Sequence, residues 1–295
     1  MATIAILMPG DMGHGVGEAL TARGHEVVSV LAGRSAHTLG LAARAGIADA
    51  GSLEDMVAVA DLILSIVPPD RALPQAEAVA GALKATGRQV PYADCNAISP
   101  ATAALVAEAL AVTGAPVIDC GIIGLNPIKT PPTRFYVSGP DHSAMAMLAS
   151  DAITVTPVGD EIGQASALKM VYAACTKGTW TLHTAVLMAA ARLGVLDPLL
   201  EEFDYSQAAV LKDMRGRTPF LPADAARWVP EMEEIAATFA GAGVTDGFHR
   251  GAAEVFRTLA ATPFAAETRE TLDRSRTLEE AIAAYIAALP PQAER

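Results

Sequence analysis

The stretch that decides the fold opens the chain: Thr3-Ile-Ala-Ile-Leu-Met-Pro-Gly10-Asp-Met-Gly13-His-Gly-Val-Gly17. It begins with an apolar run of strand length, and a helical pattern follows over residues 12–23. A strand that passes through a glycine-rich turn directly into a helix is typical of the first unit of a doubly wound α/β sheet. The context favours a dinucleotide-binding turn of the G-x-G-x-x-G type, with Met8 in place of the first glycine.

The two glycines of this turn would have distinct tasks. Gly10 would let the main chain approach a pyrophosphate, and Gly13 would permit close packing of the helix on the strand. The amide groups of Asp11 and Met12, at the N-terminus of the helix, would face the anion. A glycine-rich turn can also be purely structural, so these four residues form a candidate pyrophosphate site.

Short apolar runs and helical patterns alternate through the rest of the first half, which indicates β-α-β units. We expect strands at residues 3–7, 27–31, 62–67, 90–93 and 116–119, and helices at 12–23, 37–45, 71–85 and 100–113. The prediction is an α/β class, a Rossmann-type doubly wound parallel sheet. A loop rich in proline and glycine follows at 121–132, and residues 134–138 read as one further strand.

The second half of the chain reads as all-α, since no convincing strand follows residue 163. We expect helices at 164–192, 198–214, 224–238, 247–261 and 278–289. The sequence therefore predicts two domains, a Rossmann domain over 1–160 and an all-α domain over 161–295.

Charge and composition exclude several classes of partner. The 295 residues include 33 acidic and 21 basic side chains, which gives a net charge of -12. Nucleic acid and anionic membrane are poor partners for such a surface, whereas a small anion in a cleft is compatible with it. We expect no signal peptide and no membrane span. Three cysteines without a C-x-x-C pair predict no disulfide framework and no metal site, and favour a reducing, cytoplasmic location.

The end of the second predicted strand bears on the type of cofactor. NAD enzymes place an acid there for the ribose hydroxyls, but none occurs between Glu26 and Asp49. Arg34 follows the strand instead, with Ser35 and Thr38 close behind, and these residues suit a 2′-phosphate. The cofactor prediction is therefore NADP, with NAD less favoured. The alternative is that Arg34 is a solvated residue at the start of a helix.

Several segments resemble the β-hydroxyacid dehydrogenases, the group of 3-hydroxyisobutyrate dehydrogenase and 6-phosphogluconate dehydrogenase. The glycine turn is followed by Asp61-Leu-Ile-Leu-Ser-Ile-Val67-Pro68-Pro69, then Asp94-Cys-Asn96-Ala-Ile-Ser-Pro100, then Val117-Ile-Asp119-Cys-Gly121-Ile-Ile-Gly124 and Gly163-Gln-Ala-Ser-Ala-Leu-Lys169-Met-Val. Their order is similar to the order of the family's motifs over residues 4–173. The match looks closest to a poorly characterised branch related to 6-phosphogluconate dehydrogenase.

This resemblance implies roles for residues of the matched segments. Val67, Pro68 and Asn96 would border the nicotinamide ribose, in agreement with the rule that ligands lie beyond the carboxyl ends of such strands. The segment that approaches the substrate would consist of Gly121, Ile122, Ile123 and Gly124. Lys169 corresponds to the family's catalytic lysine. The resemblance also implies that the Rossmann domain over 1–160 is the NADP-binding domain and that the all-α domain over 161–295 serves substrate binding and dimerisation, in a homodimer as in the family.

Departures from the family's pattern put the substrate in doubt. Ile123 stands in place of the serine of the substrate segment, Gly121 in place of its proline, and Ala165 in place of the second glycine of the lysine motif. The asparagine four residues after the lysine is replaced by Ala173. Thr176 stands where the phosphogluconate enzymes have a glutamate, so decarboxylating phosphogluconate chemistry is not expected.

Lys169 is also a catalytic candidate on chemical grounds, because it lies in a strongly apolar helical segment. A lysine there is costly to bury without a role or a partner. In an alcohol oxidation by hydride transfer a base must take the hydroxyl proton, and in the reverse reaction an acid must return it. The ammonium charge would also stabilise a developing alkoxide. The alternative is that the stem crosses apolar surface while the head stays in water.

The helical period places further residues near the face of Lys169. Thr176, Trp180 and roughly His183 share that face, and Tyr172 lies to its side. We expect Tyr172 and Thr176 at the substrate, with Tyr172 compensating for the missing asparagine. The simpler interpretation of this stripe is a core or subunit contact.

The sequence thus predicts an NADP-preferring oxidoreductase that transfers a hydride between NADP(H) and a small 3-hydroxy acid or a related hydroxy or carbonyl compound. Its substrate would be a small acidic molecule. Two alternatives remain. An imine reductase would share the fold, although the imine reductases that resemble this family usually lack the lysine. A non-catalytic NADP-binding regulatory protein is the other.

Overall fold

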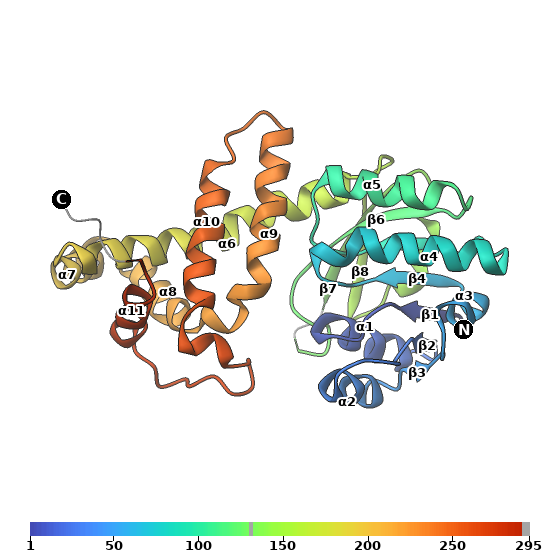
Figure 1. Ribbon diagram of the computed structural model, residues 1–295, viewed down its shortest axis with the longest axis horizontal. Coiled ribbons are helices and arrows are strands. Elements are labelled where there is room, and N and C mark those ends of the chain that lie inside the picture. Colours follow the sequence, from blue (N-terminus) through green and yellow to red (C-terminus); the bar gives the residue numbers. More distant parts are fainter. Residues whose placement is uncertain (130–131, 291–295) are drawn as a thin grey trace. The chain divides into compact units, whose positions relative to one another are not determined.

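The computed structural model describes residues 1–129 and 132–290 of the chain (Figure 1). The chain divides into two compact units, Met1–Met170 and Val171–Arg295. The helix α6, Gln164–Arg192, begins in the first unit and continues in the second. The division expected from the sequence, after residue 160, precedes this helix.

The first unit is built on one sheet of eight strands, whose order is β3-β2-β1-β4-β5-β6-β7-β8. From one edge to the other these are β3 (Ala48–Asp49), β2 (Glu26–Ser29), β1 (Thr3–Ile6), β4 (Leu62–Ser65), β5 (Tyr92–Asp94), β6 (Val117–Ile123), β7 (Thr133–Ser138) and β8 (Ile153–Gly159). All neighbouring pairs are parallel except β6 and β7. The predicted Rossmann-type sheet is confirmed, with one antiparallel connection.

Two strands and one α-helix of this unit were missed in the sequence. β3 has only two residues, and the helix α3 (Leu53–Val59) has seven. Both are too short to give a periodic pattern. β8 lies at the sheet edge, most of its residues are partly or fully exposed, and it contains Pro157. An edge strand with proline lacks the continuous apolar run of a buried parallel strand.

Helices cover both faces of the sheet. The helices α1 (Asp11–Thr21) and α2 (Ala36–Arg44), with a 3₁₀ turn at Ser143–Leu148, pack on one face, and α3, α4 (Ala72–Thr86) and α5 (Pro100–Ala111) pack on the other (Figure 1). Because helices cover both faces of the sheet, successive residues of β1 alternate between two hydrophobic cores. Ile4 and Ile6 belong to the first core, and Ala5 and Leu7 to the second, because successive strand residues point to opposite faces.

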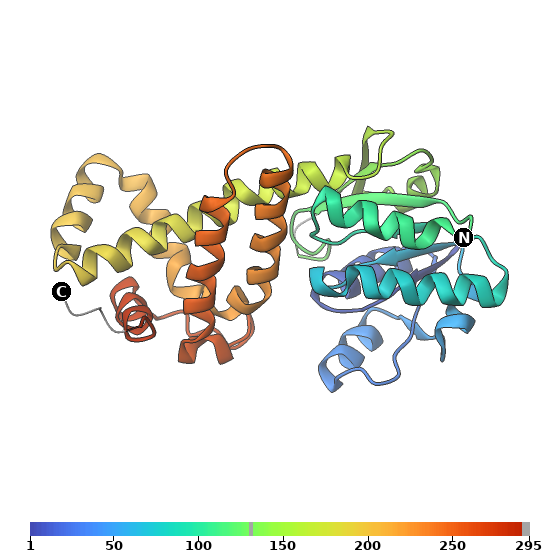
Figure 2. The same cartoon turned by 45° about the horizontal axis from the view of Figure 1, so that its top comes forward.

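The second unit is all-helical, as predicted. After α6 come α7 (Leu196–Ser206), α8 (Ala208–Arg217), α9 (Pro222–Gly241), α10 (Gly247–Ala260) and α11 (Leu278–Ala287). α9 and α10 lie side by side in both views (Figures 1 and 2). The single helix expected at 198–214 is instead two helices, because Gln207 leaves the helical conformation with φ -143° and ψ 45°.

Aromatic rings form the centre of the second unit. Trp180 of α6 packs on Trp228 of α9 with ring centroids 5.5 Å apart, and Trp228 packs on Phe256 of α10 at 5.2 Å. An ion pair accompanies them, since Lys177 Nζ lies 2.6 Å from the buried Glu231 carboxylate. Trp180 is therefore partly buried against the core of this unit, which agrees with the simpler interpretation of its stripe.

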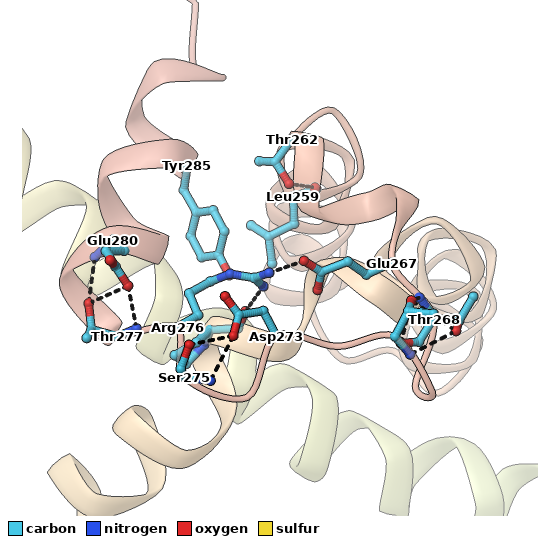
Figure 3. A network of polar contacts seen from close by, with 12 residues as sticks. Leu259, Thr262, Glu267, Thr268, Asp273, Ser275, Arg276, Thr277, Glu280 and Tyr285 are labelled. Carbon is cyan, nitrogen blue, oxygen red and sulfur yellow. Dashed lines mark hydrogen bonds and ion pairs between the residues drawn. The ribbon is translucent and has the colours of Figure 1, made fainter.

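The segment between α10 and α11 is fastened by Arg276, whose side chain is buried (Figure 3). Its guanidinium donates to the Pro219 carbonyl at 2.9 Å, pairs with Glu267, and lies 3.6 Å from the centre of the Phe264 ring. Tyr285 of α11 donates to the Thr218 carbonyl at 2.6 Å. These contacts tie the C-terminal helix to the segment between α8 and α9.

No helix in residues 1–129 and 132–290 is long and apolar enough to cross a membrane. The same residues contain no group of three or more histidine, cysteine, aspartate or glutamate side chains arranged to hold a metal ion.

Candidate active site

The first strand-to-helix turn and the helix α1 contain four glycines, and for three of them neighbouring atoms leave no room for a side chain. A Cβ on Gly13 would lie 2.2 Å from the Met8 carbonyl oxygen, and one on Gly17 would lie 2.7 Å from Ile47 Cδ1. A Cβ on Gly15 would overlap the side-chain amide of Asn126 at 2.0 Å. A Cβ on Gly10 would meet only the end of the Met8 side chain, at 3.7 Å. Protein packing therefore does not require a glycine at position 10.

The departure at Met8 has a structural explanation. No residue other than glycine has a positive φ in the described part of the chain, so the main chain at Met8 adopts a conformation open to any residue. The Met8 carbonyl oxygen, and not its side chain, is the atom nearest to Gly13 on α1. A methionine is thus accommodated where the G-x-G-x-x-G pattern has its first glycine.

Arg34 is held at the carboxyl end of β1 and β2. Its Nη2 donates to the Leu7 carbonyl at 2.9 Å and its Nε to the Val30 carbonyl at 3.3 Å. Ser35 is the N-cap of α2, and its hydroxyl accepts from the Thr38 amide at 3.2 Å. The three predicted adenosine-end residues are therefore neighbours on one strand-to-helix turn.

An acid that the sequence reading missed lies beside this turn. Asp49 comes from β3, which pairs with β2, and its Oδ1 accepts from the main-chain amides of Leu31 and Gly51, each at 3.0 Å. These two bonds hold the pKa of Asp49 below its usual value. The residue is far from Arg34 in sequence, and only the pairing of β2 with β3 brings it here.

Asn96 joins the loops that follow β4 and β5. Its Oδ1 accepts from the Val67 amide at 2.6 Å, and its Nδ2 donates to Ser65 Oγ at 3.0 Å and to Asp94 Oδ2 at 2.9 Å. The side chain is buried. Pro68 follows Val67 directly, so Val67, Pro68 and Asn96 lie at the same edge of the sheet.

The carboxyl group of Asp94, which accepts a hydrogen bond from Asn96, is buried as well. The pKa of Asp94 is raised to about 7, chiefly by burial and also by the nearby Asp119, while the hydrogen bonds from Asn96 oppose the shift. A group with this pKa exchanges its proton near neutral pH.

Strand β6 and helix α6 approach so closely that only glycine fits between them. A Cβ on Gly121 would lie 2.6 Å from the Ala165 carbonyl oxygen and 2.9 Å from Lys169 Cβ. The Lys169 ammonium donates to the main-chain carbonyl of Ile122. The structure thus brings the lysine and the segment from Gly121 to Gly124 together.

The carboxylate of Asp119, in β6, holds the start of α6 in place through hydrogen bonds. Its Oδ2 accepts from the amides of Gly163 at 2.9 Å and Ser166 at 3.0 Å and from the Ser138 hydroxyl at 3.0 Å. Its Oδ1 accepts from the Ser166 hydroxyl at 2.5 Å. A carboxylate at a helix N-terminus also interacts favourably with the helix dipole.

Asn126 is a second residue that the sequence reading missed. Its Nδ2 donates to the Asp11 carbonyl at 2.7 Å, and its amide fills the space that Gly15 leaves. The loop after β6 is thereby bonded to the first turn of α1. No local sequence signal points to this contact.

The cofactor and substrate candidates of the first unit share one edge of the sheet. Gly10 follows β1, Arg34 follows β2, Val67 follows β4 and Asn96 follows β5, while Gly121 to Gly124 form the end of β6. These five strands are parallel, so their carboxyl ends coincide. Ligands of doubly wound sheets bind at this edge.

Comparison with known families agrees with this geometry. Residues 3–149 match the family model described as the NAD binding domain of 6-phosphogluconate dehydrogenase, and residues 190–259 match a domain of unknown function, DUF1932. The chain belongs to the β-hydroxyacid dehydrogenase family. It carries the NAD(P)-binding domain of an oxidoreductase of the hydroxyacid-dehydrogenase type.

Relatives of this dehydrogenase-family chain include uncharacterised proteins. An uncharacterised 28.5 kDa protein in the 7S RNA 5′ region of Methanothermus fervidus is 27% identical over 189 residues, which are 64% of this chain and 71% of that protein. A conserved hypothetical protein from Sinorhizobium meliloti 1021 is 25% identical, with a TM-score of 0.66 and coverage of 98% and 97%.

A solved dehydrogenase shares the fold. The structure of 3-hydroxyisobutyrate dehydrogenase from Mycobacterium tuberculosis with L-serine has a TM-score of 0.67, 19% identity, and coverage of 96% of this chain and 98% of that one. At this identity the likeness establishes the fold of the β-hydroxyacid dehydrogenases and nothing finer.

The β-hydroxyacid dehydrogenase motifs depart from the usual pattern where the substrate segment lies. Ile122 and Ile123 are both buried, with 3% and 5% of their surface exposed. Only their main-chain groups can therefore meet a ligand. Gly124 has a φ of +129°, a conformation that side-chain-bearing residues rarely adopt.

The remaining candidate site residues predicted from the sequence lie on the part of α6 that belongs to the second unit. Tyr172 is about half exposed, and the Thr176 hydroxyl donates to the Ala173 carbonyl at 3.2 Å. Both follow Lys169 on one continuous helix. His183 Nδ1 lies 3.9 Å from the Asp213 carboxylate. Burial has the largest effect on the pKa of His183 and lowers it, whereas Asp213 acts in the opposite direction. Trp180 and His183 thus have partners within the helical unit.

Proposed function

We propose that this protein is an NADP-preferring oxidoreductase that moves a hydride between NADP(H) and a small 3-hydroxy acid or a related hydroxy or carbonyl compound. Lys169 is its general acid and base. One observation carries the proposal: the Lys169 ammonium is bonded to the Ile122 carbonyl, where α6 meets the carboxyl end of β6 across Gly121. A proton-transfer group at this edge adjoins the place where the family holds its nicotinamide.

The residues present fit a dinucleotide. Gly10 is a glycine that packing does not require, directly before the N-terminus of α1, and a pyrophosphate needs both the uncovered main chain and the helix amides of Asp11, Met12 and Gly13. A glycine that no neighbour crowds is the mark expected where a ligand approaches the main chain. Val67, Pro68 and Asn96 would border the nicotinamide ribose.

The bound cofactor supplies the hydride exchange. The chain's own task is to orient the substrate and to move one proton. As the neutral amine, Lys169 takes the hydroxyl proton in the oxidation, and as the ammonium it returns a proton to the carbonyl oxygen in the reduction. Its bond to the Ile122 carbonyl directs the ammonium along β6, and its positive charge stabilises the oxygen that becomes anionic.

Substrate recognition relies on the main chain in this proposal. Ile123 and Ala173 replace two polar residues of the family, and the Ile123 side chain is buried. Gly121, Ile122, Ile123 and Gly124 therefore approach a small acidic substrate through their backbone groups. Tyr172 and Thr176, three and seven residues after Lys169 on α6, are the side-chain hydroxyls that we assign to the substrate.

The preference for NADP rests on Arg34. Its bonds to the Leu7 and Val30 carbonyls hold the guanidinium at the end of β2, where a 2′-phosphate would lie. Ser35 and Thr38 add hydroxyls on the same turn. Asp49 is the observation that favours NAD, because an acid at this end of the sheet can accept from ribose hydroxyls. Its oxygen Oδ1 already accepts two main-chain bonds, so we favour the phosphate.

The reaction is tested with a panel of small 3-hydroxy acids and their semialdehydes, each with NADPH or NADP and with NADH or NAD. Lys169→Ala should bind NADPH with unchanged affinity and lose on the order of 100-fold or more in kcat. Lys84→Ala, which removes an exposed lysine of α4, is the matched control and should keep full activity. Turnover that survives in Lys169→Ala would contradict the assignment.

Two other functions give different results in the same panel. Reduction of imines without any turnover of hydroxy acids would indicate an imine reductase, against which Lys169 itself argues. Tight NADPH binding without consumption by any hydroxy acid, semialdehyde or imine would indicate a non-catalytic regulatory protein.

We further propose that the protein is a cytoplasmic homodimer. Cys95 and Cys120 are buried and unbridged, and Cys175 is an exposed free thiol, a state that a reducing compartment preserves. Sedimentation equilibrium measures the number of chains directly.

A further inference from the structure

Asp94 is a buried carboxyl group that the proposed reaction leaves without a task. It is the last residue of β5, and only 2% of its surface is exposed. Burial of a carboxyl group is costly, and an apolar residue at the same position would avoid that cost. A buried titratable group at the ligand-binding edge of a sheet is a candidate for a functional role.

Both oxygens of the Asp94 carboxyl group accept hydrogen bonds from one residue. Oδ1 accepts from the main-chain amide of Asn96 at 3.0 Å, and Oδ2 accepts from Asn96 Nδ2 at 2.9 Å. An ionised carboxylate is an acceptor only, whereas a protonated acid carries one donor. Two oxygens that both face donors therefore correspond to the ionised form of Asp94.

The Asn96 side chain carries this requirement on to the loop after β4. Its Nδ2 donates to Asp94 and to Ser65 Oγ, the latter at 3.0 Å, and its Oδ1 accepts from the Val67 amide at 2.6 Å. The oxygen and the nitrogen lie on opposite sides of one planar amide group. An acceptor at Asp94 thus keeps Nδ2 on that side and leaves Oδ1 for the Val67 amide.

A proton on Oδ2 of Asp94 reverses the requirement. The new hydroxyl faces Asn96 Nδ2, which is also a donor, and it gains an acceptor when the Asn96 amide turns over and presents Oδ1. Ser65 tolerates the change because a hydroxyl can both donate and accept. Nδ2 then faces the Val67 amide, so two donors meet and the Val67 amide loses its acceptor.

The groups around Asp94 leave this proton exchange to one carboxyl group near neutral pH. In the sheet Asp94 pairs with Ser65 on one side and with Asp119 on the other, and burial and Asp119 together raise its pKa to about 7. Burial raises the pKa of Tyr92 and of Cys95 on the same strand, so both are neutral in this range. The buried residues of α4 and α5 over this face are all apolar.

We propose that Asp94 is a positioning residue of the cofactor site, whose ionised carboxylate turns the Asn96 amide so that it holds the Val67 amide, and whose protonation releases Val67. The inference rests on the proposed function, because that function places Val67, Pro68 and Asn96 at the nicotinamide ribose. The ionised form of Asp94 is then the form that binds the nicotinamide half of the dinucleotide. The affinity for NADPH increases as the pH rises through the pKa of Asp94.

A purely structural role of Asp94 would have a different signature. If its carboxyl group only supported the turn after β5, its replacement would weaken the binding of NADPH by the same factor at every pH. A positioning role predicts a factor that depends on pH, because the wild type itself loses the carboxylate as the pH falls.

Calorimetric titration of the full chain with NADPH between about pH 6 and 8 tests the proposal. Asp94→Asn offers one oxygen and one NH₂ group, as the protonated acid offers one oxygen and one hydroxyl, so it mimics the protonated form at every pH. Wild type and variant should bind NADPH equally near pH 6, and the wild type should bind about 5-fold more tightly near pH 8, the effect of one hydrogen bond. Titration of the 2′-phosphate cancels in this ratio. Asp151→Asn, at an exposed position, is the matched control and should follow the wild type.

Asn96→Ser is a second variant that leaves the Asp94 carboxyl group in place. A hydroxyl can donate or accept, whichever Asp94 requires, so the affinity of this variant for NADPH should not gain the 5-fold between these pH values. NADH, which has no 2′-phosphate, should reproduce the pH dependence of the wild type. A ratio between wild type and Asp94→Asn that is constant with pH would overturn the inference and leave the proposed function standing. Absence of NADPH binding at every pH would overturn both.

Discussion

Ser166 donates two hydrogen bonds to the carboxylate of Asp119, one from its hydroxyl at 2.5 Å and one from its amide at 3.0 Å. The pair joins the sixth strand to the first turn of α6, and Lys169 lies one helical turn further along. The position of the proposed acid and base therefore depends on a carboxylate whose hydrogen bonds go to the start of α6 and to Ser138.

Asp119→Asn should weaken this junction. One oxygen would become an NH₂ group that faces donors, and we expect a loss of about 2–4 kcal/mol in the free energy of unfolding. Ser166→Ala removes only the hydroxyl bond and should cost about 1 kcal/mol. Urea denaturation at neutral pH measures both, and equal losses would show that the extra bonds to Asp119 contribute nothing.

Gly10→Ala and Gly13→Ala form a pair with opposite expectations. The new Cβ at position 10 meets only a flexible methyl group at 3.7 Å, so the variant should unfold within about 1 kcal/mol of the wild type yet bind NADPH at least about 10-fold more weakly. At position 13 the Cβ would lie 2.2 Å from the Met8 carbonyl oxygen, and the strain should cost about 2–4 kcal/mol.

Denaturation curves and fluorescence titration with NADPH separate these two effects. If Gly10→Ala binds the cofactor as tightly as the wild type, the pyrophosphate does not lie against this turn.

The raised pKa of Asp94 predicts how the free energy of unfolding changes with pH. Its pKa is raised from 3.8 to about 7 by burial, so the folded chain holds a proton that the unfolded chain releases. Stability is therefore greatest near and below the unfolded pKa and falls as the pH rises to the folded pKa, with no further loss from this group above it. Between about pH 6 and 8 the wild type should lose on the order of 1 kcal/mol more than Asp94→Asn.

Urea denaturation of both chains across this range checks the difference in slope. Parallel curves for the wild type and Asp94→Asn would mean that another group carries the pH dependence.

Arg276 should be the most sensitive residue of the segment between α10 and α11. Its replacement by alanine removes the bonds to Pro219 and Glu267 and the contact with Phe264, and it leaves the carboxylate of Glu267 without its partner. We expect a loss of about 3 kcal/mol and faster proteolysis between residues 261 and 277. Arg274→Ala, at an exposed position, should leave the digestion pattern unchanged.

The fold could be predicted where a single segment carries its own signal. The strands in the middle of the sheet are continuous apolar runs because helices bury them on both faces, and β1, β4 and β5 were found for this reason. β8 was missed because an edge strand needs no such run, and the break at Gln207 was missed because both flanking segments favour a helix.

The residues of the candidate site also fall into two groups: those that a local motif identifies and those that only the folded structure brings together. Gly10, Arg34 and Lys169 stand within contiguous motifs, so the sequence alone pointed to them. Asp49 and Asn126 act through contacts with residues 18 and 115 positions away, and neither has a motif of its own. Polar contacts of this kind depend on strand pairing and loop course, which the local pattern does not contain.

The bond from Asn126 to the Asp11 carbonyl has a consequence for the order of events in turnover. A ligand that binds to the first turn of α1 also fixes the position of Asn126 in the loop after β6, because Asn126 Nδ2 donates to the Asp11 carbonyl at 2.7 Å. The dinucleotide should then enter first and leave last. Such a compulsory sequence appears in product-inhibition patterns, where the oxidised and reduced nucleotides compete with each other while the acid and the carbonyl compound do not compete with either.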